Sequence, residues 1–392
     1  MVPEGWLREP LCDVADVRTG IAKGKKDLKN PVSVPYLRVA NVQDGHLDLT
    51  VIKNICVEPY QVERYRLKEG DVLMTEGGDF DKLGRGDVWK GQIDPCLHQN
   101  HVFCVRANQK IILPYFLSSL SGSSYGKFYF LSCAKKSTNL ASINSTQLKE
   151  FPVLIPPISE QRKIISILST WDKAIETIEK LIENSKAQKK ALMQQLLTGK
   201  RRLPGFDEEW KTIRLDDVLD GKKRKGKIVP TNDEKRGVAY IGSTSFNGDF
   251  GIYTDSSDAV ICSPKDILVL WDGENAGKAT TGLSGAVSST VVRCRIDESK
   301  ANSRFITYNL LKDNYKVRAI REGSGIPHMP GDFEHWYHIN LPPLKEQQEI
   351  AAILTSADKE IETLQQKLDY LKQEKKSLMQ QILTGKRRVI IN

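Results

Sequence analysis

The chain has 392 residues, of which 40% are hydrophobic and 27% charged, and its 28 Gly and 17 Pro are ordinary for a soluble protein. Collagen-like, disordered and membrane classes are therefore excluded, and the length predicts two to three domains at about 150 residues each. The net charge of +9 favours a polyanionic partner such as nucleic acid.

Nothing in the sequence directs the chain to a membrane or out of the cell. No apolar run approaches the ~20 residues of a membrane span, and the first residues contain no apolar signal core. The 7 cysteines form no CxxC pair and are expected to be reduced thiols. We therefore expect a cytoplasmic protein.

Residues 1–155 predict a mixed α+β globular segment. Apolar runs at 51–52, 71–74 and 101–105 are typical of short strands, and residues 114–121 predict a helix. Three loops combine Gly with basic and polar side chains, a composition that suits contacts with phosphates and base edges, although each loop alone could be a solvated turn. The candidate DNA-binding residues here are Lys23, Lys25, Lys26, Asp79, Lys82, Arg85, Lys135, Lys136, Ser137 and Asn139.

Residues 156–202 predict a long helix that begins after two prolines and ends at Gly199. Apolar residues, or residues that a seam tolerates, recur in alternating steps of four and three from Ile164 to Leu196, which is the seam of a coiled coil. A helix of about 39 residues would be about 58 Å long. Two ordinary core helices, this one and its repeat below, are the alternative interpretation, which the regular spacing disfavours.

Residues 203–341 predict a second α+β segment. An apolar run at 267–270 predicts a strand and residues 303–311 predict a helix. Basic and polar loops stand early, in the middle and near the end of this segment, as they do in the first. Its candidate DNA-binding residues are Lys222, Arg224, Lys225, Lys227, Asn275, Lys278, Ser324 and His328.

Residues 342–388 repeat residues 156–202 without a gap, with 25 identities in the 47 positions, so the chain contains an internal duplication. The seam keeps its phase in both copies, with Lys189 and Lys375 at matching positions, and a lysine in a seam can fix the register. The predicted spacer helix seam consists of Ile164, Leu168, Trp171, Ile175, Ile178, Ile182, Ile350, Leu354, Ile361, Leu364, Leu368 and Leu371.

Catalytic and metal-binding motifs are absent. The Gly-rich stretch at 273–278 is one residue short of a P-loop, and no dinucleotide-binding or methyltransferase motif occurs. Cys96, His98, His101 and Cys104 could ligate zinc, but the spacing is unusual for a zinc site and His101 to Cys104 lies in an alternating, strand-like stretch. We expect no metal, no cofactor on this chain and no catalytic residues.

The repeated starts, IPPISEQ and LPPLKEQ, and the repeated ends, LTGKRR, resemble the specificity subunit of type I restriction–modification enzymes over the whole chain. The resemblance implies two target recognition domains, residues 1–155 and 203–341, and two conserved helices, residues 156–202 and 342–388. It implies an α+β fold in which two long antiparallel coiled-coil helices separate the recognition domains with approximate two-fold symmetry.

The same resemblance implies the function and the partners. Each recognition domain would read one half of a split double-stranded DNA target. Two methyltransferase subunits, which carry S-adenosylmethionine, would dock on the chain, and restriction subunits that translocate DNA could join. One departure from exact repetition is Trp171, which corresponds to Ala357. The alternative is a non-catalytic coiled-coil scaffold that binds DNA without sequence preference.

Overall fold

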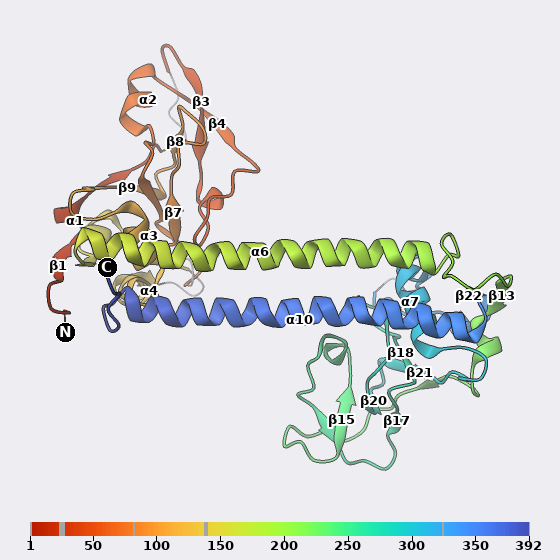
Figure 1. Cartoon of the computed structure of the whole chain (residues 1–392). Coiled ribbons are helices and arrows are strands. Elements are labelled where there is room, and N and C mark those ends of the chain that lie inside the picture. Colours follow the sequence, from red (N-terminus) through yellow and green to blue (C-terminus); the bar gives the residue numbers. More distant parts are fainter. Residues whose placement is uncertain (1, 23–27, 81–82, 137–139, 324, 392) are drawn as a thin grey trace. The chain divides into compact units, whose positions relative to one another are not determined.

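The computed structural model describes residues 2–22, 28–80, 83–136, 140–323 and 325–391 (Figure 1). The chain divides into two compact units, the first made of residues 1–179 and 367–392 and the second of residues 180–366. Helices α6 (Ile158–Leu196) and α10 (Leu344–Ile382) each pass from one unit into the other. The units therefore cut across the four predicted segments, because each globular part is grouped with half of both helices.

The first unit contains a four-stranded antiparallel sheet and three smaller sheets. The four-stranded sheet has the order β2 (Ala15–Thr19), β9 (Val102–Ala107), β5 (Asp71–Thr75) and β7 (Gly86–Val88). A second sheet has the order β4 (Lys53–Val57), β3 (Val32–Leu37) and β8 (Leu97–His98), in which β3 and β8 are parallel. The terminal strands β1 (Leu7–Pro10) and β12 (Pro152–Ile155) pair with each other.

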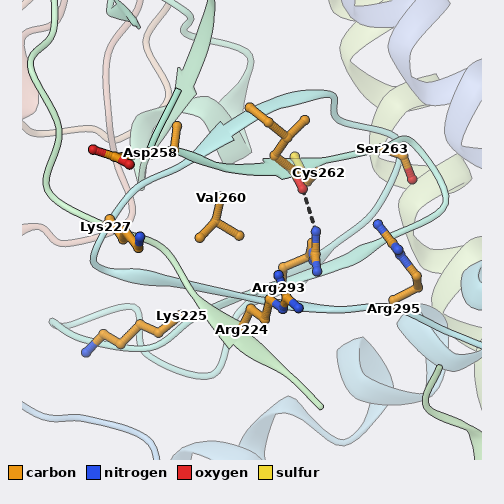
Figure 2. Close-up of a pocket in the computed structure, with 11 residues that line it drawn as sticks. Arg224, Lys225, Lys227, Asp258, Val260, Cys262, Ser263, Arg293 and Arg295 are labelled. Atoms are coloured by element: carbon orange, nitrogen blue, oxygen red, sulfur yellow. Dashed lines mark hydrogen bonds between the residues drawn. The ribbon is translucent and has the colours of Figure 1, made fainter. Parts of the chain in front are cut away.

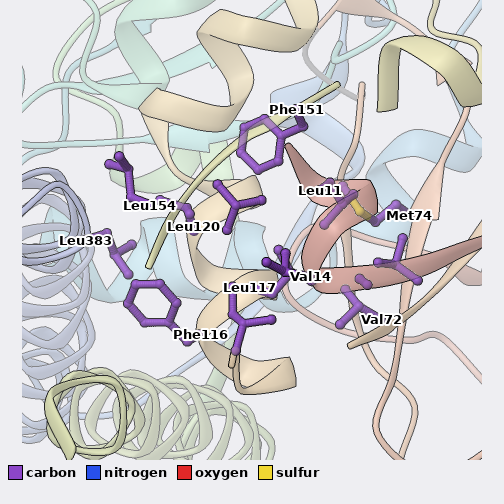
Figure 3. Close-up of a cluster of buried hydrophobic side chains, with 14 of the residues drawn as sticks. Leu11, Val14, Val72, Met74, Phe116, Leu117, Leu120, Phe151, Leu154 and Leu383 are labelled. Atoms are coloured by element: carbon purple, nitrogen blue, oxygen red, sulfur yellow. The ribbon is translucent and has the colours of Figure 1, made fainter. Parts of the chain in front are cut away.

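The short helices of the first unit are α1 (Leu11–Val14), α2 (Pro59–Tyr65), α3 (Pro114–Gly122), α4 (Ser124–Cys133) and α5 (Ser145–Lys149). The prediction of a helix at 114–121 is confirmed, and α3 begins with proline at a position that needs no N–H donor. The core of this unit joins α3 to the sheet and to the long helices. Figure 3 shows Phe116 of α3 and Leu154 of β12 beside Leu383, and all three residues belong to one buried cluster.

The second unit repeats this topology. Its first sheet has the order β14 (Arg224–Lys225), β21 (Val291–Cys294), β18 (Ile267–Leu270) and β19 (Ala279–Thr280), all antiparallel. Its second sheet has the order β16 (Tyr253–Thr254), β15 (Val238–Ile241), β20 (Gly285–Val287) and β17 (Val260–Cys262), with β15 and β20 parallel. Strands β13 (Lys211–Arg214) and β22 (His338–Leu341) pair like β1 and β12.

The helices of the second unit are α7 (Ser303–Lys312), α8 (Asn314–Ala319) and α9 (Phe333–Trp336). The helix predicted at 303–311 is therefore confirmed, and Asn302 caps it by accepting a hydrogen bond from the Phe305 N–H at 3.1 Å. Phe305 is fully buried and packs in one cluster with Ile350 and Leu354 of α10. The α+β class is confirmed, and the strand order of the four-stranded antiparallel sheet and the pairing of the terminal strands recur in both units.

The strand predicted at Val51–Ile52 is wrong. Strand β4 begins two residues later, at Lys53. Asn41 explains the shift, because its Nδ2 group donates hydrogen bonds to the carbonyl oxygens of Asp48 and Val51, at 2.8 and 3.1 Å. These bonds hold residues 48–51 in a bend, and the Val51 carbonyl oxygen is bonded to a side chain instead of to a neighbouring strand.

Within the described residues, no helix is both long enough and apolar enough to cross a membrane.

Candidate nucleic-acid interface

Two predicted loops of the first unit lie side by side in a small sheet. Strand β11 (Ala141–Ser142) pairs on one side with β6 (Gly77–Gly78) and on the other with β10 (Lys135–Lys136). A Cβ atom added to Gly77 would lie 2.8 Å from the Ala141 carbonyl oxygen, so this close approach requires glycine. The pairing brings the loop that follows residue 78 next to the basic loop that begins at residue 135.

The described candidate residues of these loops differ in exposure. Lys135, Lys136 and Asp79 are exposed, whereas Arg85 is half-buried. The Arg85 Nε atom is buried, and it has no hydrogen-bond partner among the residues that the structure describes. Seven predicted residues lie outside the described residues: Lys23, Lys25, Lys26, Lys82, Ser137, Asn139 and Ser324.

All three predicted loops of the second unit meet. The Lys225 Nζ atom lies 2.7 Å from the Asp272 Oδ2 atom, which joins the early loop to the middle loop. Asp272 in turn forms an antiparallel bridge with His328, and the Gly273 N–H donates to the Pro327 carbonyl oxygen at 2.8 Å. The middle loop is thereby joined to the end loop, in the same way as in the first unit.

Further polar groups surround this junction. Lys222 and Asn275 are exposed, and Lys278 is half-buried. The Lys278 Nζ atom donates to the Asn247 Oδ1 atom at 2.8 Å, which adds the loop around residue 247 to the site. Sequence reasoning missed Asn247, since no local pattern links it to a loop 31 residues away.

A hollow of about 690 Å³ opens beside the early loop of the second unit (Figure 2). It is lined by the predicted residues Arg224, Lys225 and Lys227 and by two arginines that the sequence analysis did not single out, Arg293 and Arg295. These two stand two residues apart at the end of β21, and such side chains point to the same face of a strand. The alternation in VVRCR was the signal that could have identified them.

The Glu-Gln pair at the start of α6 attaches this helix to the first globular part. Glu160 is 1% exposed and accepts two hydrogen bonds from Arg388, both of 2.8 Å, and one from the Trp6 indole at 3.1 Å. Gln161 accepts from the Leu113 N–H at 2.8 Å and donates to the Pro156 carbonyl oxygen at 2.8 Å. The motif is thus structural.

The second unit makes the equivalent contacts. Glu346 accepts from Arg202 at 2.8 and 2.9 Å and from the Trp210 indole at 3.2 Å. Gln347 accepts from the Asn302 N–H at 2.8 Å. The repeated PPxxEQ start and the repeated basic end therefore form one attachment site per unit, in which the charged groups face each other and not an external ligand.

In each unit the halves of α6 and α10 run antiparallel. Asp172 pairs with Lys375 in the first unit, and Lys189 pairs with Asp358 in the second. Because Lys375 repeats Lys189 and Asp358 repeats Asp172, the two ion pairs are equivalent. The described seam positions, Trp171 and Ala357 included, are all buried or half-buried.

The Cys and His cluster of the first unit has structural contacts. His98 is buried, and its Nδ1 atom lies 2.7 Å from the Val102 carbonyl oxygen. Burial raises the pKa of Cys96 to about 12 and that of Cys104 well above its ordinary value, so both thiols stay protonated. Among the described residues, no group of three or more His, Cys, Asp or Glu could hold a metal ion.

Two buried thiols of the second unit are equally unsuited to nucleophilic chemistry. Burial, with the neighbouring Asp266 carboxylate, raises the pKa of Cys262 to about 11, and burial raises that of Cys294 to about 12. A thiol must lose its proton to attack, so neither residue is activated. The loop junctions of the two units instead present cations, amides and hydroxyls, which are groups that bind phosphates and base edges.

Comparisons with known proteins agree with this chemistry. The chain is 27% identical over 406 residues to the putative type I restriction enzyme MjaX specificity subunit of Methanocaldococcus jannaschii, covering 99% of this chain and 95% of that one. The fold is similar to that of the type I restriction–modification S subunit from M. genitalium, with a TM-score of 0.59 and 14% identity over 97% and 99% of the two chains. A chain from another type I system has a TM-score of 0.63 and 19% identity, covering 98% of both chains.

A family profile described as the type I restriction modification DNA specificity domain matches residues 3–185 and 207–373. These two matches follow the duplication, and together they span most of the sequence. The chain therefore belongs to the family of type I restriction–modification DNA specificity subunits.

Proposed function

We propose that this chain is the sequence-specific DNA-recognition subunit of a type I restriction–modification complex, and that each globular part reads one half of a split target. The observation that carries the proposal is the junction of loops that occurs in both units. It joins β6 to β11 in the first unit and Asp272 to His328 in the second. Each junction holds exposed cations beside side chains able to bond base edges.

The two long helices are proposed to act as a coiled-coil spacer between the two reading parts. Their 39-residue lengths, the regular seam and the paired seam lysines support this proposal. A rigid spacer would fix the distance between half-sites, as the spacing of subunits does in dimeric DNA-binding proteins. Because the two globular parts differ in sequence, the two halves of the target would differ as well.

The catalytic work is proposed to lie on other chains. Two methyltransferase subunits, carrying S-adenosylmethionine, and restriction subunits would assemble with this one. The protonated thiols and the structural use of the Glu-Gln motif support a chain that binds and positions DNA. Membership of a DNA specificity family favours this function over a coiled-coil scaffold without sequence preference.

The test is to produce the full chain together with methyltransferase subunits of a type I system, in a host without adenine methylation, and to map methylated sites across the genome. We expect one two-part target. Asn275→Ala should change the preference in one half only, while Asn184→Ala, on an exposed helix surface, should leave both halves unchanged. Methylation without any common target would contradict the proposal.

A further inference from the structure

The hollow of the second unit is lined by basic residues of and beside strands β14 and β21 and by the segment of residues 258–263. Arg224 and Arg293 are register partners in the β14–β21 pair. The Arg293 Nη1 atom donates to the Ile261 carbonyl oxygen at 2.6 Å, which holds the guanidinium against the segment of residues 258–263 (Figure 2). Figure 2 places Lys227 near Asp258 and Arg295 toward the opposite end of the view.

Positive charge in this hollow exceeds what the neighbouring carboxylates balance. Five cationic side chains line it, together with one acidic residue, Asp258. Two of the cations have a partner elsewhere, because Lys225 pairs with Asp272 and Arg295 pairs with Asp266.

The other three cations are not balanced by carboxylates. No acceptor from the described part of the chain bonds the side chains of Arg224 and Lys227, and the buried Arg293 Nε atom likewise has no partner there. Like charges held together repel each other, so the hollow is suited to an external anion.

The first unit fills the equivalent positions differently. Its matching strand pair places Cys104 where the second unit has Arg293, because each residue stands opposite the leucine that follows the buried aspartate by two residues, Leu73 or Leu268. The first unit's Arg106, which matches Arg295, is held by two hydrogen bonds to Asp71, both of 2.7 Å. At these two described positions the first unit therefore has no free cation, in contrast to Arg293 in the second unit.

We propose that this hollow is a phosphate-binding site. Guanidinium and ammonium groups bind phosphate through charge-assisted N–H donors, and Arg224 and Arg293, on adjacent strands, line the hollow together with Lys227. The inference deepens the proposed function and rests on it where the phosphate belongs to the DNA backbone. A free phosphate or a nucleotide is the other source of the same chemistry.

The test uses the full chain and the double substitution Arg224→Gln with Lys227→Gln. Because neither side chain has a partner within the described residues, the fold should be kept, as thermal melting will verify. The matched control is Lys211→Gln with Lys345→Gln, which removes the same charge from exposed positions of the second unit outside the hollow. Two probes are used: a 30-base-pair duplex titrated at several salt concentrations, and inorganic phosphate in a calorimetric titration.

If the phosphate belongs to DNA, the slope of log K for duplex binding against log salt should fall by up to about 1.8 in the variant Arg224→Gln with Lys227→Gln, because each lost phosphate contact removes about 0.9. The slope should fall less in the control. A free-phosphate source predicts saturable binding of inorganic phosphate that the hollow variant loses and the control keeps. The proposal is overturned if the hollow variant matches the control with both probes. A wild-type complex that still methylates a two-part target would then leave the proposed function standing, so the two failures are distinguishable.

Discussion

Replacing Asp71 by Ala should destabilise the first unit more than replacing Asp266 by Ala destabilises the second. The two aspartates occupy the same place in the repeated fold, and each is 1% exposed. Asp71 accepts two hydrogen bonds of 2.7 Å from Arg106, whose side chain is only 24% exposed. These bonds raise the pKa of Arg106 above its ordinary value. Asp266 receives one longer contact of 3.3 Å from Arg295, whose side chain is 48% exposed.

The exposure of the arginine decides the cost. Removing one partner of a buried ion pair costs about 3–5 kcal/mol, and partial hydration of Arg106 places Asp71→Ala near the lower end, at about 3 kcal/mol. Arg295 becomes hydrated when Asp266 is lost, so the cost is mainly that of the Ser263 N–H left without its acceptor, about 1 kcal/mol. For units of this size these values correspond to falls of about 6–12 °C and about 2–4 °C in Tm.

Scanning calorimetry of the full chain measures both Tm values, and hydrogen exchange shows which unit has been destabilised. Asp233→Ala, at an exposed position of the second unit, is the control and should change neither transition. Equal losses for Asp71→Ala and Asp266→Ala would refute the reasoning, because the structure assigns the difference to the geometry and exposure of the arginine partner.

Two further changes test the first unit. Burial lowers the pKa of His98, so below about pH 6.5 the unfolded chain binds a proton that the folded chain lacks. The free energy of unfolding therefore falls with decreasing pH, and His98→Asn should make this fall smaller in urea unfolding between pH 7 and 5. An unchanged pH dependence in the variant would exclude His98 as its source. Lys135→Gln with Lys136→Gln should reduce the salt slope of DNA binding by up to about 1.8, whereas Lys90→Gln with Lys110→Gln should not. Equal slopes would show that the Lys135 loop does not face DNA.

The long helices were predictable because their signals are local. Paired prolines, a seam with alternating steps of four and three, and a glycine three residues past the last helical residue all act within one continuous segment. The structure confirms helices of 39 residues, with Gly199 and Gly385 at positive φ after their ends. Helices α3 and α7 were predictable for similar reasons, from an initial proline and from an Asn cap.

The grouping of the site residues was only partly predictable. The sequence located the loops, but the bridge from Asp272 to His328 and the pairing of Gly77 with Ser142 join residues more than 50 positions apart. No local propensity encodes such contacts. The hollow depends in the same way on β14 and β21 being neighbours, which makes the free charge on Arg293 visible only in the folded chain.

The proposed role of the helices as a spacer is testable by adding one heptad to each, after Lys180 and after Gln366. These positions are equivalent in the duplication and lie at the middle of both helices. Seven residues preserve the phase of the seam, so Lys189 should still meet Asp358 and Lys375 should still meet Asp172. Each helix would lengthen by about 10.5 Å at 1.5 Å per residue.

Base pairs rise about 3.4 Å along the duplex axis, so the gap between half-sites should grow by up to about three base pairs while both half-sites stay the same. Three base pairs also turn one half-site by almost a third of a helical turn, because one turn of B-DNA has about 10–10.5 base pairs, and the supercoil must follow this rotation. Methylation mapping of the complex with the lengthened chain measures the new gap. The gap is measured on a variant that still methylates, because the rotation alone is enough to abolish activity. Methylation at an unchanged spacing would show that the helices do not determine the gap, which would then be fixed by the methyltransferase subunits.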